Sequence, residues 1–281
     1  MESLKSKEQA VLVTGSSSGI GKDLCRVLIN KGYIVFGSVR SKNDADALSK
    51  KLGPGFEPLI MDVTIESQVL QAKIQVEKCL KGRKLRALIN NAGVANLGPV
   101  EHMPTSEFIT QINTKILGTF LCTKTFLPLL GTNRKLKGPA GRIVNISSIL
   151  GGKIGSPFMS AYCASKHAVE AFSESLRREL KPYAIKVIIV APGSISTPIW
   201  NTLKNHIGNT SFSETEYHVP FNRVLKSLEQ FDKNSLPIEQ LSMVILKSIE
   251  TKNPKIRYTP TKDYSQKIWP YIPKKLMDQF F

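Results

Sequence analysis

Short runs of apolar residues alternate along the chain with longer stretches in which apolar residues recur at helical spacing. The runs are of strand length, rich in β-branched residues and apolar at successive positions, which is typical of parallel strands buried on both faces. They occupy positions 10–13, 33–36, 59–61, 87–89, 142–146 and 186–190, and the helical stretches include 21–31, 66–80, 106–130 and 162–181. This repeated order predicts an α/β fold, doubly wound around a mostly parallel sheet of about seven strands with helices on both faces.

The alternation ends after residue 192, where the chain becomes richer in Ser, Thr and Asn. Long segments after the last core strands of such sheets often cover the substrate, so we expect a lid at about 194–235. Its large apolar residues are Ile199, Trp200, Leu203, Phe212 and Phe221. We expect a helix over 238–251, a short strand near 255–259 and a C-terminal tail at about 262–281. Because no linker or repeat divides the chain, these parts predict a single domain over 1–281.

Composition excludes several classes of protein. Hydrophobic residues make up 41% of the 281 positions, which is enough to bury a core and excludes a disordered chain. No run approaches the ~18 apolar residues of a membrane span, and positions 1–9 lack the apolar core of a signal peptide. The four cysteines lie far apart without a Cys-x-x-Cys pair, as free thiols in a reducing compartment do, so we expect a cytoplasmic protein. No histidine pair has metal-ligand spacing, and we expect no metal.

The net charge of +17 leaves several partners open. It is compatible with nucleic acid, an anionic membrane, a phosphorylated ligand or a Lys-rich surface. The basic residues are spread out without interleaved aromatic residues, which argues against nucleic acid. In the tail, Lys267, Lys274 and Lys275 stand among aromatic residues, a mixture that an anionic membrane surface would attract. Pro270 and Pro273 break any long helix there, so we favour packing of the tail on the protein over membrane contact.

A glycine-rich turn connects the first apolar run to the first helical stretch. Positions 14–21 read Thr-Gly-Ser-Ser-Ser-Gly-Ile-Gly. Glycines permit a tight strand-to-helix turn and the close approach of a pyrophosphate, and the helix N-terminus adds free N–H groups and a positive dipole end. The turn therefore predicts a dinucleotide site, with a purely structural turn as the alternative.

Further motifs follow this turn along the chain. They are Asp62-Val63, Asn90-Asn91-Ala92-Gly93, Asn113, Asn145-Ile146-Ser147-Ser148, Tyr162-Cys163-Ala164-Ser165-Lys166 and Pro192-Gly193. With the Gly-x-x-x-Gly-x-Gly turn, this set resembles the short-chain dehydrogenase/reductase family over positions 10–199, and its hydroxysteroid and retinol dehydrogenase branch around 33–41 and 192–200. The resemblance implies a Rossmann fold, a nicotinamide cofactor, interconversion of a carbonyl and an alcohol in a small-molecule substrate, and a homodimer or homotetramer.

Tyr162 and Lys166 are four residues apart in a helical pattern and therefore share one face. An ammonium beside a phenol favours the phenolate and lowers the tyrosine pKa from its ordinary ~10, so that the phenol can exchange a proton with a carbonyl or alcohol oxygen. Ser148, or its neighbour Ser147, ends a strand at the carboxyl edge, where ligands of open sheets bind. The resemblance implies Ser148, Tyr162 and Lys166 as the catalytic set. Asn113 matches the fourth member of that set, which helps to hold a proton-relay water.

The end of the second strand indicates which dinucleotide binds. By resemblance, the position at which NAD-dependent relatives carry a carboxylate is Val39, and Arg40 follows it. A guanidinium suits a 2′-phosphate through bidentate hydrogen bonds, so we expect NADP(H) rather than NAD(H). The predicted cofactor contacts are Gly15, Ser17, Ser18, Gly19, Ile20, Gly21, Arg40, Asp62, Val63, Asn90, Ala92, Gly93, Tyr162, Lys166, Pro192, Gly193, Ile195 and Thr197. For Asn90, a structural role between two strands is an open alternative.

The leading hypothesis is an NADP(H)-dependent oxidoreductase that interconverts a ketone or aldehyde and an alcohol on an apolar, steroid-, retinoid- or lipid-like substrate. The apolar residues of the predicted lid favour such a substrate, and packing of the lid alone is the alternative for them. Two other functions stay open: a catalytically silent dinucleotide-binding regulatory protein, and an NAD-dependent dehydrogenase of small alcohols.

Overall fold

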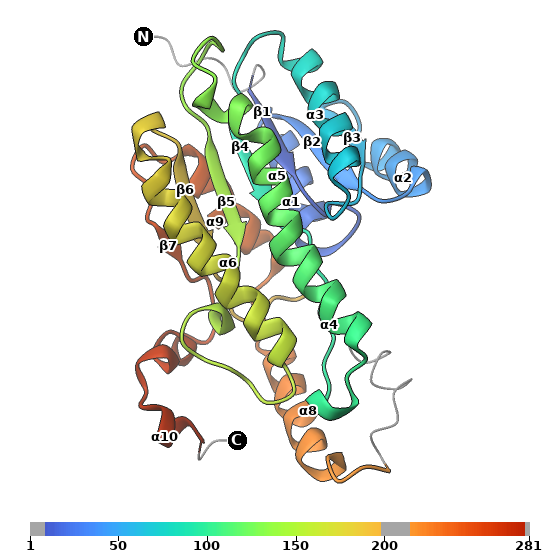
Figure 1. The fold of residues 1–281 in the computed structure, drawn as a ribbon, viewed down its shortest axis with the longest axis vertical. Helices are drawn as coiled ribbons and strands as arrows, with labels where there is room; N and C mark the ends of the chain where they lie inside the picture. Colours follow the sequence, from blue (N-terminus) through green and yellow to red (C-terminus); the bar gives the residue numbers. More distant parts are fainter. Residues whose placement is uncertain (1–8, 198–213, 279–281) are drawn as a thin grey trace.

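The computed structural model of the chain describes residues 9–197 and 214–278 and is centred on a seven-stranded sheet (Figure 1). The strands are β1 (Ala10–Val13), β2 (Ile34–Val39), β3 (Phe56–Ile60), β4 (Ala87–Asn90), β5 (Arg142–Ile146), β6 (Lys186–Val190) and β7 (Arg257–Tyr258). Their order across the sheet is β3-β2-β1-β4-β5-β6-β7, and every neighbouring pair is parallel. This confirms the predicted doubly wound Rossmann fold. Its strand order reverses between β1 and β4, and ligands of such sheets bind outside the carboxyl ends of the strands at that point.

Helices cover both faces of the sheet, which explains why its strands are apolar at successive positions. In β1, Val11 faces one core cluster and Leu12 the other, since successive side chains of a strand point to opposite faces. The first cluster takes in side chains of α1 (Gly19–Asn30), α2 (Lys42–Leu52) and α9 (Ile238–Glu250). The second takes in side chains of α3 (Glu66–Leu80), α5 (Gly118–Leu127) and α6 (Ser160–Glu179), the helices in front of the sheet in Figure 1.

The predicted helix over 106–130 is interrupted twice. It comprises α4 (Thr105–Ile112), a π-helical turn (Asn113–Leu117), α5 and a second π-helical turn (Pro128–Thr132). A π-helical turn follows i→i+5 instead of i→i+4 hydrogen bonds, so it changes the direction of the side chains around it, and such turns are frequent at functional sites. Apolar spacing alone does not reveal such an interruption.

The remaining elements are shorter or lie at the ends of the central layers. The predicted strand near 255–259 and helix over 238–251 are confirmed as β7 and α9. Within the predicted lid, α8 (His218–Lys233) is helical. Short 3₁₀ helices span Val100–His102, Ile149–Gly151, Lys181–Tyr183, Tyr264–Lys267 and Trp269–Tyr271, and α10 spans Lys274–Met277. Over the described ranges, none of the helices has the length and apolar character needed to cross a bilayer.

Candidate active site

The glycine-rich turn between β1 and α1 is fixed by its neighbours. Gly15 and Gly19 have φ values of 68° and 51°, in the left-handed region that glycine adopts without strain. The Gly15 N–H donates to Ser38 Oγ at 2.9 Å, and Asn91 Nδ2 donates to the Gly15 carbonyl oxygen at 3.0 Å. At Gly21 an added Cβ would lie 2.1 Å from that same carbonyl oxygen, so only glycine fits. No described side chain caps α1, which leaves its first N–H groups as donors for a phosphate.

A cavity of about 440 Å³ lies at the carboxyl ends of β1 to β4. Its lining contains most of the predicted cofactor contacts, namely Gly15, Ser17, Ser18, Gly19, Ile20, Arg40, Asp62, Val63, Ala92, Gly93 and Thr197. Arg40 is exposed, directly after β2. The Asp62 carboxylate accepts from the N–H and hydroxyl of Thr64 at 2.8 and 2.6 Å, which fixes its position. A helix N-terminus and a guanidinium in one cavity suit a dinucleotide that carries an additional phosphate.

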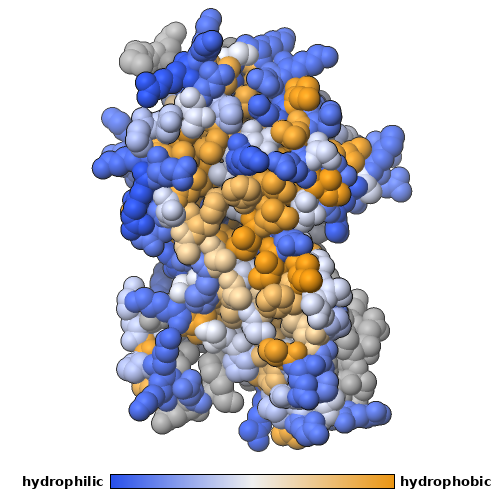
Figure 2. All heavy atoms as spheres, viewed as in Figure 1, coloured by the Kyte–Doolittle hydropathy of each residue, from blue (hydrophilic) through white to orange (hydrophobic). Residues whose placement is uncertain are grey.

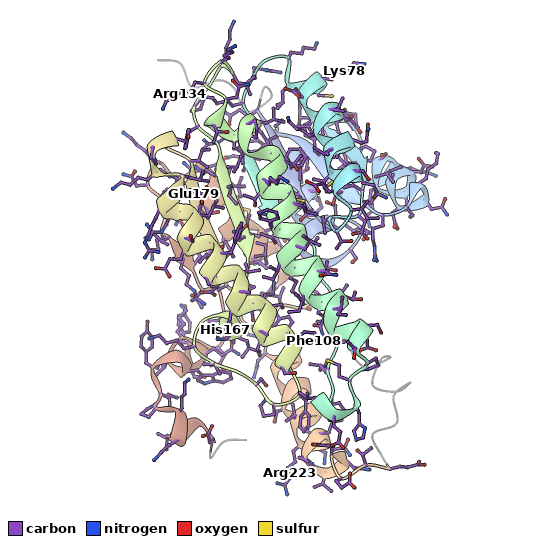
Figure 3. The ribbon with its side chains drawn as sticks, viewed as in Figure 1. Lys78, Phe108, Arg134, His167, Glu179 and Arg223 are labelled. Atoms are coloured by element: carbon purple, nitrogen blue, oxygen red, sulfur yellow. The ribbon has the colours of Figure 1, made fainter. Side chains whose placement is uncertain are left out.

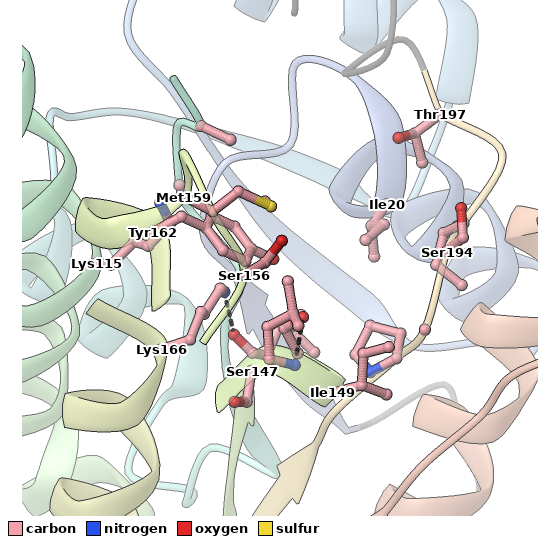
Figure 4. A pocket seen from close by; sticks show the side chains of 18 of the residues that line it. Ile20, Lys115, Ser147, Ile149, Ser156, Met159, Tyr162, Lys166, Ser194 and Thr197 are labelled. Carbon is pink, nitrogen blue, oxygen red and sulfur yellow. Dashed lines mark hydrogen bonds between the residues drawn. The ribbon is translucent and has the colours of Figure 1, made fainter. Parts of the chain in front are cut away.

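A second, mainly apolar cavity of about 240 Å³ adjoins the first, since Ile20, Gly93 and Thr197 line both. Its apolar side chains include Val94, Ala95, Leu97, Ile149, Leu150, Ile154, Met159 and Trp269. The predicted residues Ser148, Tyr162, Lys166, Pro192, Gly193 and Ile195 also line it. Figure 4 shows Tyr162, Lys166 and Met159 on one side of this space, opposite Ile20, Ser194 and Thr197. The fold thus brings three of the four predicted catalytic residues to the cavity that adjoins the first one.

Tyr162 and Lys166 meet on the first turns of α6. Lys166 Nζ lies 5.8 Å from the centroid of the Tyr162 ring and donates to the Ile146 carbonyl oxygen at 2.7 Å (Figure 4). Burial lowers the pKa of Lys166 to about 8, opposed by attraction to Glu170. Burial also raises the pKa of Tyr162, and the Ser148 hydroxyl opposes this rise only in part. The prediction of a lowered tyrosine pKa is therefore wrong for the chain on its own, because desolvation of the phenolate is the largest influence.

The two serines at the end of β5 have different partners. Ser147 Oγ donates to Glu170 Oε1 at 2.8 Å, and the same carboxylate oxygen pairs with Arg257 Nη2 at 3.0 Å. Ser148 Oγ accepts from the N–H of Leu150 at 3.2 Å, which leaves its own proton for another acceptor. The geometry therefore favours Ser148 over Ser147 as the hydroxyl that meets a ligand.

The fourth predicted catalytic residue, Asn113, belongs to neither lining in the part of the chain that the structure describes. It begins the π-helical turn, and two residues later Lys115 lines the apolar cavity. Lys115 is 3% exposed, and its Nζ lies 4.7 Å from the centroid of the Tyr162 ring. The amine donates to the Val94 carbonyl oxygen and, at 3.4 Å, to Gln111 Oε1. Sequence reasoning missed Lys115, whose signal is a charged residue inside an apolar stretch.

Two predicted cofactor contacts, Gly21 and Asn90, also lie outside both linings among the described residues. Gly21 is needed for the close packing of α1 against the Gly15 carbonyl oxygen in the turn. Asn90 Nδ2 donates to Asn145 Oδ1 at 2.8 Å and to Thr123 Oγ1 at 3.3 Å. Of its two open roles, the geometry favours the bridge between strands.

The structure describes the predicted lid over 194–197 and 214–235. Ile199, Trp200, Leu203 and Phe212 lie outside the described residues. Phe221 of α8 is buried, with its ring edge-on to Phe158 at a centroid distance of 5.1 Å. α8 therefore packs on the loop between β5 and α6, beside the apolar cavity.

Comparison with known proteins gives the family. The family model described as short chain dehydrogenase matches residues 9–208, which is more than half of the chain. The chain belongs to this family. The match covers the glycine-rich turn, strands β1 to β6, and Tyr162 and Lys166 of α6, as the resemblance in the sequence predicted.

This short-chain dehydrogenase has relatives along nearly its whole length. It is 36% identical over 272 residues to the NADPH-dependent 3-dehydrocapnine reductase of Ornithobacterium rhinotracheale, with 96% of this chain and 95% of that protein covered. It is 36% identical over 250 residues to the 3-ketodihydrosphingosine reductase of Bacteroides thetaiotaomicron, with 89% and 86% covered. Human retinol dehydrogenase 5 is 29% identical over 298 residues, with 99% and 89% covered. A solved short-chain dehydrogenase from Streptomyces avermitilis shares the fold at a TM-score of 0.77 and 24% identity, with 100% and 94% covered.

Proposed function

We propose that this short-chain dehydrogenase uses NADPH to reduce the ketone of a long-chain lipid to a secondary alcohol. The observation that carries the proposal is an apolar cavity that has Ser148, Tyr162 and Lys166 in its lining and adjoins the cavity that would hold the dinucleotide. An apolar pocket with a few convergent polar groups suits an apolar ligand held in one orientation. Two relatives named for 3-dehydrocapnine and 3-ketodihydrosphingosine cover most of both chains, which supports a 3-keto lipid of that kind over a steroid or retinoid.

NADP(H) is supported by the charge of its cavity. The N–H groups at the start of α1 would donate hydrogen bonds to the pyrophosphate, and Arg40 would bind the 2′-phosphate. Asp62 and Val63 would flank the adenine, in accordance with the resemblance. The relative from Ornithobacterium rhinotracheale is named as NADPH-dependent. NADPH, when bound, supplies the hydride that reaches the carbonyl carbon.

The chain's own groups would manage the proton. The Tyr162 phenol donates its proton to the carbonyl oxygen as that oxygen gains negative charge. The Ser148 hydroxyl donates a hydrogen bond to the same oxygen and orients it toward Tyr162. Lys166, with a pKa of about 8, is mostly an ammonium at neutral pH and stabilises the phenolate left behind. The Ile146 carbonyl oxygen, 2.7 Å from Nζ, fixes the orientation of the Lys166 side chain.

A substrate panel tests the proposal. Purified protein is mixed with NADPH or NADH and with 3-ketodihydrosphingosine, a steroid ketone, retinal or a small polar aldehyde, and cofactor oxidation is followed by absorbance. We expect turnover of the 3-keto lipid with NADPH, and its loss in Tyr162→Phe, which keeps the ring but removes the proton. Turnover of the polar aldehyde alone would overturn the lipid-like substrate. Tight NADPH binding without turnover of any compound would favour the catalytically silent alternative.

A homodimer is the second part of the proposal. Phe108, Ile109, Leu117 and Phe120 of α4, the π-helical turn and α5 are 37–48% exposed. Figure 2 shows apolar side chains gathered in the middle of this face, and Figure 3 places Phe108 on α4 beside α6, which carries His167. We expect Phe120→Ser to dissociate the dimer in sedimentation, whereas Met243→Ser, at a 52% exposed position on α9, should leave it intact. A monomeric parent protein would overturn this part alone.

A further inference from the structure

The buried side chain of Lys115 is not explained by the family's catalytic set. A lysine placed inside a protein loses hydration, a cost that structural lysines avoid by reaching to the surface. Lys115 instead points inward from the π-helical turn. Its amine donates hydrogen bonds to the Val94 carbonyl oxygen and to Gln111, and it lies over the face of the Tyr162 ring. Within the described residues, no carboxylate forms an ion pair with it. Figure 4 shows Lys115 on the side of Tyr162 away from Ile20 and Thr197.

We propose that Lys115 is a second amine of the acid–base site, which stabilises the ionised Tyr162 in the place for which the resemblance implies Asn113. The inference rests on the proposed role of Tyr162 as the proton donor. Two amines then face one phenol ring, Lys115 from the π-helical turn at 4.7 Å and Lys166 from α6 at 5.8 Å from its centroid. Since Lys115 is argued to act through Tyr162 and not on the substrate, it is a positioning residue.

The charges around the ring explain how a buried amine serves this role. Burial lowers the pKa of Lys115 well below its ordinary value, and the positive charge of Lys166 lowers it further. The Cys163 thiol opposes that shift. The Glu170 carboxylate raises the pKa of Lys166 and is not among the influences on Lys115. In its neutral form, which the lowered pKa makes easier to reach, Lys115 adds no repulsion between the two amines while Tyr162 is protonated. Once the phenolate forms, its negative charge raises the proton affinity of a nearby amine, because an opposite charge favours the charged form.

The protons balance over one reduction. The carbonyl carbon receives the hydride, and the carbonyl oxygen receives the phenol proton of Tyr162. Lys115 takes one proton from solvent and becomes an ammonium beside the phenolate. When Tyr162 regains a proton from solvent, Lys115 releases its own to solvent and both groups return to their starting forms. The net reaction consumes one hydride and one solvent proton per ketone, and Lys115 is unchanged.

The first test reads the phenol without any cofactor. Ultraviolet absorbance of tyrosinate is titrated with pH in the parent protein and in Lys115→Met, and the corresponding Tyr162→Phe backgrounds are subtracted to isolate Tyr162. Circular dichroism defines the pH range in which each protein is folded. We expect Lys115→Met to raise the pKa of Tyr162 by about one pH unit or more, since the phenolate loses a compensating charge. Lys124→Met, which removes an exposed lysine of α5, should leave the titration where it is in the parent.

The second test reads the reaction in the alcohol-oxidation direction, in which the phenolate is the active form. We expect the rising limb of kcat against pH to move upward by the same amount in Lys115→Met, with kcat at neutral pH lowered about ten-fold and KM nearly unchanged. Lys115→Arg, which keeps the positive charge, should move this rising limb part of the way back toward its pH position in the parent protein. Should Lys115→Met fail to fold, Lys115→Gln retains donors for Val94 and serves in its place.

Each outcome separates the two proposals. An unmoved tyrosine titration and an unmoved limb in Lys115→Met would overturn the role of Lys115, as would the same shifts appearing in Asn113→Ala instead. Full turnover in Tyr162→Phe would overturn the proposed function itself, whatever Lys115 does.

Discussion

The side chains of Asn90 and Asn145 join β4 to β5 at their carboxyl ends, with Asn90 Nδ2 donating to Asn145 Oδ1 at 2.8 Å. Both residues are buried, and Asn145 donates in turn to Ser173 Oγ of α6 at 2.7 Å. The chain of hydrogen bonds connects the neighbouring strands β4 and β5 to the helix that carries Tyr162. Asn90 therefore supports the site from within the sheet.

Asn90→Ala should lower the free energy of unfolding by about 1–3 kcal/mol, because Asn145 Oδ1 is left buried without its donor. Urea unfolding measures this loss. Asn145→Ala provides the matched control: the double variant should cost less than the sum of the single ones, since both remove the same hydrogen bond. A fall in NADPH affinity at unchanged stability would instead assign Asn90 to the cofactor.

Ser148 and Ser147 should separate activity from stability. Ser148→Ala removes the hydroxyl proposed to hold the carbonyl oxygen, and we expect kcat to fall about 100-fold or more with the fold intact. Ser147→Ala removes the hydrogen bond to Glu170 and should mainly cost about 1 kcal/mol of stability. Steady-state kinetics and thermal unfolding of both variants check the pair. The opposite pattern would make Ser147 the substrate-facing hydroxyl.

Arg40 should decide the choice of dinucleotide. Arg40→Ala is expected to weaken NADPH binding roughly 10- to 100-fold, since hydrogen bonds between charged groups are lost, while NADH binding stays nearly the same. Titration calorimetry or cofactor fluorescence measures both affinities. Lys50→Ala removes a positive charge from an exposed position of nearby α2 and controls for the general attraction of the basic surface. Equal losses for NADPH and NADH would contradict the assignment.

Gly21 should tolerate no side chain. In Gly21→Ala the new Cβ meets the Gly15 carbonyl oxygen at 2.1 Å, a backbone atom that cannot rotate away, so we expect a loss of about 3 kcal/mol or more. Gly155→Ala is the matched control, because Gly155, like Gly21, has no positive φ, and no atom lies within 4 Å of the added Cβ. That variant should lose little or no stability. Similar losses in both variants would mean that the close approach to Gly15 is not what requires glycine at position 21.

The sheet and the glycine-rich turn were predictable because their signals are local. Strands buried on both faces carry apolar residues at every position, as β1 does, and α3 begins and ends at the predicted residues. The turn needs glycine at specified positions, which any sequence with this geometry must show. Family motifs then pointed to Ser148, Tyr162 and Lys166, which the fold brings to one cavity.

The position of Lys115 and the pKa of Tyr162 depend on tertiary structure and were missed for that reason. A helical pattern over 106–130 contains no sign of the π-helical turn. That turn directs Lys115 inward, whereas Asn113 lines neither cavity in the part of the chain that the structure describes. The spacing of Tyr162 and Lys166 predicted that they share a face, but not that burial would be the largest influence on the pKa of both. Burial depends on what packs over α6 from distant parts of the chain, and it reversed the expected direction of the tyrosine pKa.

Lys166 should make the stability of the fold depend on pH in a defined window. Its pKa is about 8 in the folded chain and about 10.4 in an unfolded one, so the unfolded state binds more protons between these values. Stability attributable to this group therefore rises with pH from about 8 to about 10.4, by roughly 3 kcal/mol in total, and is constant below pH 8. Lys166→Met and Lys166→Gln both remove the titration, and the second keeps a donor for the Ile146 carbonyl oxygen. Urea unfolding between pH 7 and pH 10.5 should show the free energy of unfolding of the parent rising relative to that of both variants across that window. Parallel curves of this free energy against pH would mean that Lys166 is not desolvated as the structure indicates.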